Sequence, residues 1–179
     1  MQSYITVPAI LTLVVLYGLM ILSTVRMLRV RQDEEPGWTA LTPGPPHWFG
    51  LIGSWLAVGL MSWVWIFVGS ARRDAAQQMQ IAFGLILAFG FCSVFSAHFM
   101  ASIKRMNLRW RGAMLVFNGP AGPQKLDMGD AMAFRRDLSG SYRFTFEGGE
   151  VVKVDPFAKG SDAFFAKIFA VINKKTNRT

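Results

Sequence analysis

Three long windows of the chain carry no charged side chain, and each window contains an apolar run long enough to cross a membrane. The runs cover roughly residues 5–25, 48–69 and 80–101. An α-helix rises about 1.5 Å per residue, so about 20 apolar residues span a hydrocarbon core of about 30 Å. Buried helices of soluble proteins are typically shorter and amphipathic. The pattern therefore predicts three transmembrane helices, which form a domain over residues 1–103.

After the third run the pattern changes from continuous hydrophobicity to short alternating segments. Tyr142, Phe144 and Phe146 share one face of a strictly alternating stretch, which is typical of a half-buried strand. Gly148-Gly149 follows and predicts a two-residue hairpin turn, because both turn positions favour a positive φ. The sequence thus predicts about five antiparallel strands, at 113–118, 125–128, 131–136, 142–147 and 150–155.

A helix is predicted at the C-terminal end of this region. Ser161 or Asp162 can cap its first turn, and apolar residues recur behind them at helical spacing. The residues expected to face the core are Phe165, Ile168 and Ile172.

The order of these elements, together with the strand pair around AMAFRRD, the hairpin GSYRFTFEGGEVVKVD and the helix FFAKI, resembles the small pleckstrin-homology-like domains of bacterial membrane proteins. The resemblance covers roughly residues 104–173. It implies a curved, partly open antiparallel β-barrel that a C-terminal helix plugs at one end. The expected fold class is therefore membrane α+β, with a pleckstrin-homology-like (PH-like) domain over residues 104–179 after the transmembrane domain.

Composition and charge support the membrane assignment and predict an orientation. The chain is 52% hydrophobic and only 17% charged, whereas soluble domains carry about 25% charge. Lys and Arg near the ends of spans favour the cytoplasmic side. An N-terminus outside places seven such residues inside and only Arg72 and Arg73 outside, so we expect a cytoplasmic C-terminal domain. The resemblance implies that the membrane is a bacterial inner membrane. The seven residues, here called the cationic collar, are Arg26, Arg29, Arg31, Lys104, Arg105, Arg109 and Arg111.

The collar has two interpretations at this point: it contacts anionic lipid headgroups, or it only sets the topology. Tryptophans agree with the orientation. Trp48 is expected at the inner interface, and Trp63 and Trp65 at the outer one, as in an aromatic belt.

Few residues of the sequence are candidates for binding a metal or a cofactor. His47 and His98 are the two histidines, and both are expected at the cytoplasmic leaflet. Two imidazoles from adjacent helices are candidate ligands for a haem iron or another metal. We expect them instead to be interface residues whose polar tips reach the headgroups. No cofactor and no metal are predicted, with haem as the alternative.

Other sequence features also argue against an enzyme or a transporter. Cys92 is the single cysteine and is interpreted as a small packing residue. Asp127, Asp130 and Asp137 occupy turn-like positions, where turn chemistry explains them. The spans carry no acidic or basic residue besides His98, whereas coupled transporters normally keep ionisable groups there. Basic residues of the C-terminal region are interspersed with acidic ones, so no nucleic-acid partner is expected.

Small residues recur four apart along the second and third spans. Such rows let helices approach closely. They serve either packing among the chain's own helices or docking of another membrane subunit, and both interpretations remain open here. The residues are Gly50, Gly53, Ser54, Ala57, Gly84, Ala88, Ser93, Ala97 and Ala101.

These observations predict a non-enzymatic integral membrane protein that serves as an accessory, assembly or scaffold subunit of a membrane complex. Its expected partners are membrane lipids and other membrane protein subunits. One alternative is a membrane-anchored module that senses anionic lipids. The other is a haem- or metal-carrying redox protein built on His47 and His98.

Overall fold

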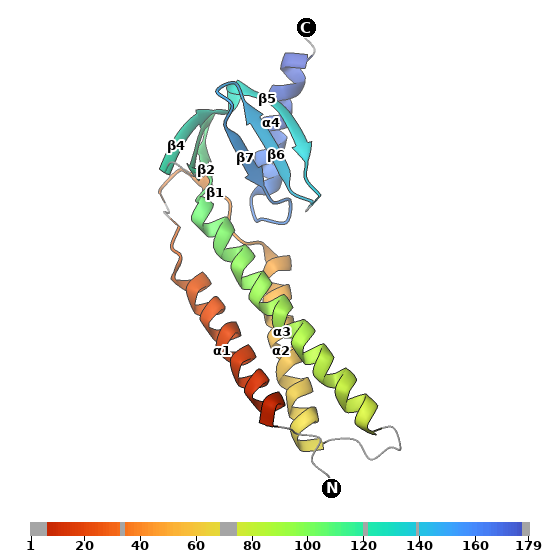
Figure 1. Ribbon diagram of the computed structural model, residues 1–179. Coiled ribbons are helices and arrows are strands. Elements are labelled where there is room, and N and C mark those ends of the chain that lie inside the picture. The colour runs from red at the N-terminus through yellow and green to blue at the C-terminus, as the bar shows by residue number, and fades with distance from the viewer. Residues whose placement is uncertain (1–6, 33–34, 69–74, 120–121, 139, 177–179) are drawn as a thin grey trace. The chain divides into compact units, whose positions relative to one another are not determined.

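Figure 1 shows the computed structural model of the chain, which describes residues 7–32, 35–68, 75–119, 122–138 and 140–176. The chain divides into two compact units. The helical unit comprises Met1–Arg29 and His47–Ala101, and the β unit comprises Val30–Pro46 and Ser102–Thr179. The chain therefore passes between the two units three times.

Three long helices supply the helical unit. Helix α1 spans Val7–Arg29, α2 spans Pro45–Trp63 and continues as a π-helix (η1) over Val64–Val68, and α3 spans Ala75–Met106. All three are long and apolar enough to cross a membrane, so the prediction of three such helices is confirmed by length and composition.

The helices extend beyond the predicted spans. Helix α1 continues past residue 25, α2 starts three residues early on a Pro pair that suits a first helical turn, and α3 gains five residues at each end. With 32 residues, α3 is about 48 Å long, which exceeds a hydrocarbon core of about 30 Å. Residues 5–6 and 69 of the predicted spans, and Arg72 and Arg73, lie outside the described residues.

Helices α1 and α2 pack antiparallel. The Tyr17 hydroxyl donates to the Val58 carbonyl oxygen at 3.5 Å, and the Trp55 indole N–H donates to the Thr24 hydroxyl at 3.4 Å. A higher number on α1 thus meets a lower number on α2. The Tyr17 and Trp55 rings also contact each other, with centroids 6.3 Å apart.

Helix α3 returns antiparallel to α2. The Trp65 indole N–H donates to the Met79 carbonyl oxygen at 3.1 Å, and the Trp65 ring lies 5.4 Å from that of Phe83. Trp65 is buried, so its assignment to the outer aromatic belt is wrong: its side chain packs between helices. Trp48 and Trp63 are exposed, as a belt requires. The buried core of this unit is Leu13, Met20, Val58, Trp65, Met79 and Ile86.

The β unit contains two antiparallel sheets and a helix. A four-stranded sheet has the order β1-β2-β3-β4, and a three-stranded sheet has the order β5-β6-β7. The antiparallel strands and the C-terminal helix confirm the coarse prediction, and β1 and β2 are additions to it. The elements are β1 (Thr39–Ala40), β2 (Arg109–Arg111), β3 (Met114–Gly119), β4 (Gly122–Asp127), the short 3-10 helix η2 (Met128–Asp130), β5 (Ala131–Arg136), β6 (Tyr142–Phe146), β7 (Val151–Val154) and α4 (Ser161–Thr176).

Strand β1 comes from the connection between α1 and α2. Its Thr39 pairs with Trp110 of β2, and the Leu41 N–H donates to the Leu108 carbonyl oxygen at 2.8 Å. Leu41 is fully buried in the β unit's core. Residues 30–46, which the sequence analysis counted with the transmembrane domain, therefore belong to the β unit.

The turn between β6 and β7 differs from the predicted two-residue turn. The Phe146 N–H donates to the Glu150 carbonyl oxygen at 3.0 Å, and the Gly149 N–H donates to the Phe146 carbonyl oxygen at 2.9 Å. Three residues thus form the loop. Only Gly149 of the glycine pair has a positive φ, +85°. This is a three-residue hairpin loop with glycine in the left-handed position.

The core of the β unit forms between the sheets and α4. Phe144 and Phe146 are buried, as predicted from the alternation of β6. Helix α4 buries Phe164, Ile168 and Ile172, whereas Phe165 is half-buried against Tyr142 at 4.9 Å between ring centroids. The predicted helix face is therefore corrected by one residue, from Phe165 to Phe164, because residues four apart share a face.

Candidate functional site

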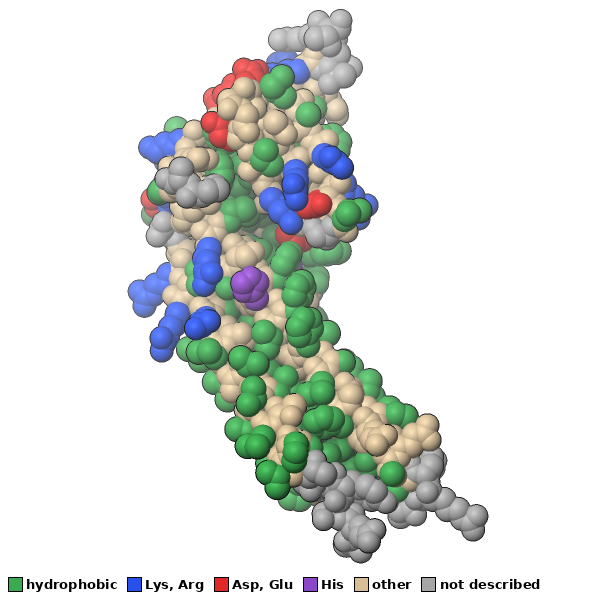
Figure 2. Space-filling view, viewed as in Figure 1, with side chains coloured by type: hydrophobic (Ala, Val, Ile, Leu, Met, Phe, Trp, Pro, Cys, Tyr) green, Lys and Arg blue, Asp and Glu red, His purple; other side chains and the backbone are tan. Residues whose placement is uncertain are grey.

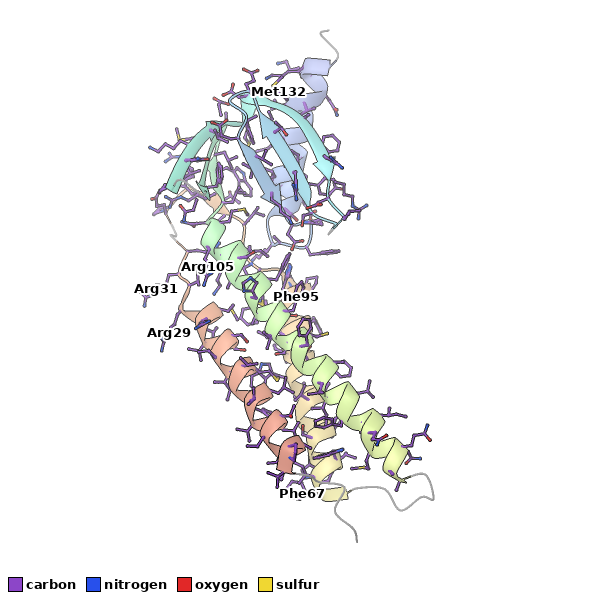
Figure 3. The ribbon with its side chains drawn as sticks, in the orientation of Figure 1. Arg29, Arg31, Phe67, Phe95, Arg105 and Met132 are labelled. Carbon is purple, nitrogen blue, oxygen red and sulfur yellow. The ribbon has the colours of Figure 1, made fainter. Side chains whose placement is uncertain are left out.

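Most of the cationic collar lies at helix ends and is exposed. Arg26 and Arg29 occupy the last turn of α1, and Lys104 and Arg105 the last turn of α3, where cations suit the negative end of the helix dipole. In Figure 3 Arg29, Arg31 and Arg105 each extend away from the backbone that carries them. The exposed collar residues are Arg26, Arg29, Arg31, Arg105 and Arg111, whereas Lys104 is half-buried.

Arg109 differs from the rest of the collar. Its guanidinium forms an ion pair with Glu35 at 3.0 Å and lies over the Trp38 ring, 5.5 Å from the centroid. Its side chain is only 14% exposed. Arg109 therefore fastens the 30–46 segment to β2, and its role is structural.

The two histidines lie differently. His47, in the first turn of α2, stacks on Phe99 of α3 with ring centroids 5.5 Å apart. His98 precedes Phe99 and is exposed. Successive helical residues point about 100° apart, so the Phe99 ring that faces His47 turns His98 away. Among the described residues no group of three or more His, Cys, Asp or Glu side chains is placed to hold a metal ion. This geometry does not favour the haem interpretation.

The small-residue rows divide into a buried and an outward set. Ser93, Ala97 and Ala101 are buried along α3, and Ser54 is buried on α2. Gly50 faces Ser96 of α3, whose hydroxyl would lie 3.3 Å from an added Cβ. The outward set comprises Gly53, Gly84 and Ala88, which are exposed, while Ala57 is half-buried. Gly90 of α3, which was not among the predicted packing residues, lies against the Leu16 side chain of α1, where an added Cβ would clash.

A shallow hollow adjoins the outward set. It has a volume of about 410 Å³ and is lined by Ala9, Trp65, Ala76, Met79, Gln80, Phe83 and Gly84. Figure 2 shows that the described part of the visible helical surface carries hydrophobic and uncharged side chains over most of its length. Cys92, interpreted as a packing residue, is exposed and therefore does not pack inside the helical unit. The outer face of α3 is thus open to lipid or to another helix.

The acidic residues assigned to turns have the expected contacts. The Gly129 N–H donates to Asp127 Oδ1 at 2.7 Å, and the Leu138 N–H donates to Asp137 Oδ1 at 2.8 Å. The Asp130 carbonyl oxygen accepts from the Glu147 N–H at 3.0 Å. These contacts confirm the turn interpretation of Asp127 and Asp137.

Sequence reasoning missed a second basic surface, at the end of the β5–β6 hairpin. Asp137 Oδ2 accepts from Arg143 Nη2 at 2.7 Å and lies 3.4 Å from Lys153 Nζ. The Arg143 hydrogen bond lowers the pKa of Asp137 below its ordinary value of 3.8. We define the hairpin cluster as Arg135, Arg143 and Lys153 around Asp137, with Leu138 at the turn. The register of the hairpin and the order of the sheet bring these residues together, and neither can be read directly from the sequence.

Comparisons with known proteins add no family assignment. No family model, no curated protein and no solved structure matches the chain.

Proposed function

We propose that the chain is a non-enzymatic accessory or scaffold subunit of a membrane protein complex in a bacterial inner membrane. Its three helices anchor a PH-like β domain on the cytoplasmic side, and the helices and the domain bind partner proteins. The observation that carries this proposal is the outward surface of the helices. Each span buries fewer than a third of its residues within the protein, and the outward positions include the small residues Gly53, Gly84 and Ala88.

Small outward residues support helix docking because lipid provides no hydrophobic drive for association. Transmembrane helices associate through close van der Waals packing instead, which small residues allow. The hollow beside Gly84 offers space for a side chain of a partner helix. A chain without ionisable clusters in its described spans has little means for transport chemistry, which further supports a binding role.

The PH-like assignment is supported by the arrangement of the β unit. Two antiparallel sheets are followed by a helix that buries Phe164, Ile168 and Ile172 in their shared core. This is the position expected of a helix that plugs a partly open barrel. The cytoplasmic orientation is supported by the exposed basic residues at the C-terminal ends of α1 and α3.

Native purification of the tagged full-length chain in a mild detergent, followed by mass spectrometry, tests the proposal. We expect stoichiometric membrane partners. An added Cβ at Gly53, Gly84 or Gly18 meets no atom within 4 Å, so a larger side chain can start at each position without a clash at its first carbon. Gly53→Leu and Gly84→Leu should reduce partner recovery, and Gly18→Leu on α1 is the matched control. Recovery as a lone monomer at every detergent strength contradicts the proposal.

A second candidate function, anionic-lipid sensing, is favoured by the five exposed collar residues. Each basic residue near an anionic surface contributes about 1 kcal/mol of attraction. The test is mass spectrometry of lipids retained by the full chain, with Arg29→Gln plus Arg105→Gln against Lys167→Gln on α4. Equal retention of anionic and zwitterionic lipids by all variants would dismiss this candidate.

A further inference from the structure

The turn between β5 and β6 holds an apolar side chain away from the protein. Leu138 has a relative exposure of 106%, the highest among the large hydrophobic side chains that the structure describes. Three hydrogen bonds join the described residues of this turn. Asp137 Oδ1 accepts the Leu138 N–H, the Asp137 N–H donates to the Ser141 carbonyl oxygen at 2.7 Å, and the Gly140 N–H donates to the Asp137 carbonyl oxygen at 2.9 Å. These bonds hold the backbone beside Leu138, and the Leu138 side chain is left exposed.

A row of basic residues crosses the sheet beside this turn. Arg135 of β5 lies directly opposite Arg143 of β6, and Arg143 lies directly opposite Lys153 of β7. Like charges directly opposite each other destabilise a sheet. Asp137 compensates only part of this repulsion, since it provides one carboxylate for three cations. Figure 2 shows the result on the β unit as blue side chains grouped around a red one.

The β unit is also polarised along β6. The hairpin cluster lies at the N-terminal end of this strand, and the β6–β7 turn at its other end carries Glu147 and Glu150. The Glu147 N–H donates to the Asp130 carbonyl oxygen, which places a third acidic residue at that end. Glu147 is paired with Lys175 at 2.7 Å, so the excess negative charge at that end comes from Glu150 and Asp130. An anionic surface would therefore attract the hairpin cluster more strongly than the opposite end of β6.

We propose that the hairpin cluster is a contact site for anionic membrane lipid: Arg135, Arg143 and Lys153 bind headgroup phosphates, and Leu138 inserts between the headgroups. A basic rim around an exposed aliphatic tip matches a surface that is anionic outside and apolar beneath. A soluble phosphate would make no use of Leu138. The chain enters the β unit from the helices twice, after Arg29 and after Ala101, so the membrane is the anionic surface that is always within reach of this tethered unit. The inference rests on the membrane anchoring proposed above and adds a site outside the collar.

The test uses the full chain in lipid nanodiscs. In a Cys92→Ala background, Leu138→Cys carries an environment-sensitive fluorophore, and Thr145→Cys, exposed on β6 away from the turn, carries the same label as the control. We expect the Leu138 label to shift to shorter wavelength as the fraction of phosphatidylglycerol in phosphatidylcholine rises, and the Thr145 label to remain constant. Raised salt should reverse the shift, because exposed charges are screened.

Charge variants separate the hairpin from a general effect of net charge. Arg135→Gln plus Lys153→Gln removes two of the three proposed phosphate ligands, leaves the hydrogen bonds between Arg143 and Asp137 intact, and should abolish most of the shift. Lys125→Gln plus Lys167→Gln removes the same charge from β4 and α4 and should leave the shift in place.

Several outcomes would overturn the inference. These are a Leu138 label that is insensitive to lipid composition, an equal shift at Thr145, an equal shift with inorganic phosphate and no anionic lipid, or a shift that requires an added acidic protein. Carbonate extraction of the same samples distinguishes the two proposals. If the chain resists extraction but the emission of its Leu138 label does not change, only this inference is overturned. If the chain is stripped from the bilayer, the proposed membrane anchoring is overturned as well.

Discussion

Replacing Leu41 by Ala tests whether the α1–α2 connection is part of the β unit's core. Leu41 is fully buried in a cluster with Leu108, Trp110 and Phe164. Truncating a buried Leu to Ala typically costs about 2–5 kcal/mol, because the removed methyl groups leave a cavity. Domains of this kind have a total stability of about 5–15 kcal/mol. We therefore expect Leu41→Ala to remove a large share of the stability of the β unit.

The assay is hydrogen–deuterium exchange of the full chain in mild detergent. A loss of 2 kcal/mol accelerates exchange through unfolding about thirtyfold, since each 1.4 kcal/mol is about a factor of ten. The acceleration should appear in peptides from β2, β3 and β6, while peptides from α1–α3 serve as an internal reference. Leu138→Ala is the matched control, because it is the same substitution at a fully exposed site. Equal protection in the two variants would refute the assignment of residues 30–46 to the β unit.

Three further predictions follow from single contacts. Gly44→Ala should destabilise the β unit by about 1–3 kcal/mol in the same exchange assay, because its Cβ would collide with the Phe157 carbonyl oxygen; unchanged exchange would contradict this packing. Trp65→Phe should lower the thermal stability of the helical unit in detergent by about 1 kcal/mol, since the hydrogen bond to Met79 is lost; an unaltered melting curve would exclude that bond. The lowered pKa of Asp137 means that its ion pairs stabilise the hairpin above pH 4 and are lost as the pH falls through the lowered pKa. NMR titration should show this acid step, and Asp137→Asn should remove it.

Patterns within short stretches of sequence correctly predicted the helices and strands that such stretches determine by themselves. The long apolar runs predicted three spans, and the alternation of Tyr142, Phe144 and Phe146 predicted β6 and its buried face. Both patterns are periodicities, which a single sequence displays directly. The ends of the helices were less accurate, because polar residues such as Arg29 continue a helix at no cost once they reach water.

Long-range pairing explains the errors. Thr39 and Ala40 lie in a stretch that has the composition of a Pro/Gly loop, and they form a strand only because β2 lies beside them. Arg109 appeared to be one more collar residue, and its ion pair with Glu35 depends on the same long-range contact. Trp65 was assigned to the aromatic belt from its position near the end of a span, and that position does not determine whether its ring faces lipid or another helix.

The candidate site was predictable to a similar extent. Exposed collar residues could be identified from their position at the span ends. The hairpin cluster was not found, because Arg135, Arg143 and Lys153 become neighbours only when three strands adopt a particular register. Charge patterns across a sheet require that register, and sequence alone left it unassigned.

The pairing of Thr39 with Trp110 sets an order for biosynthesis. Strand β1 emerges from the ribosome about 70 residues before its partner, a delay of about 4–14 s at 5–20 residues per second. During that interval two further hydrophobic helices are made and can be delivered to the bilayer. The β unit therefore completes its folding only after the last helix has been synthesised, so a folded domain never stands in the way of insertion.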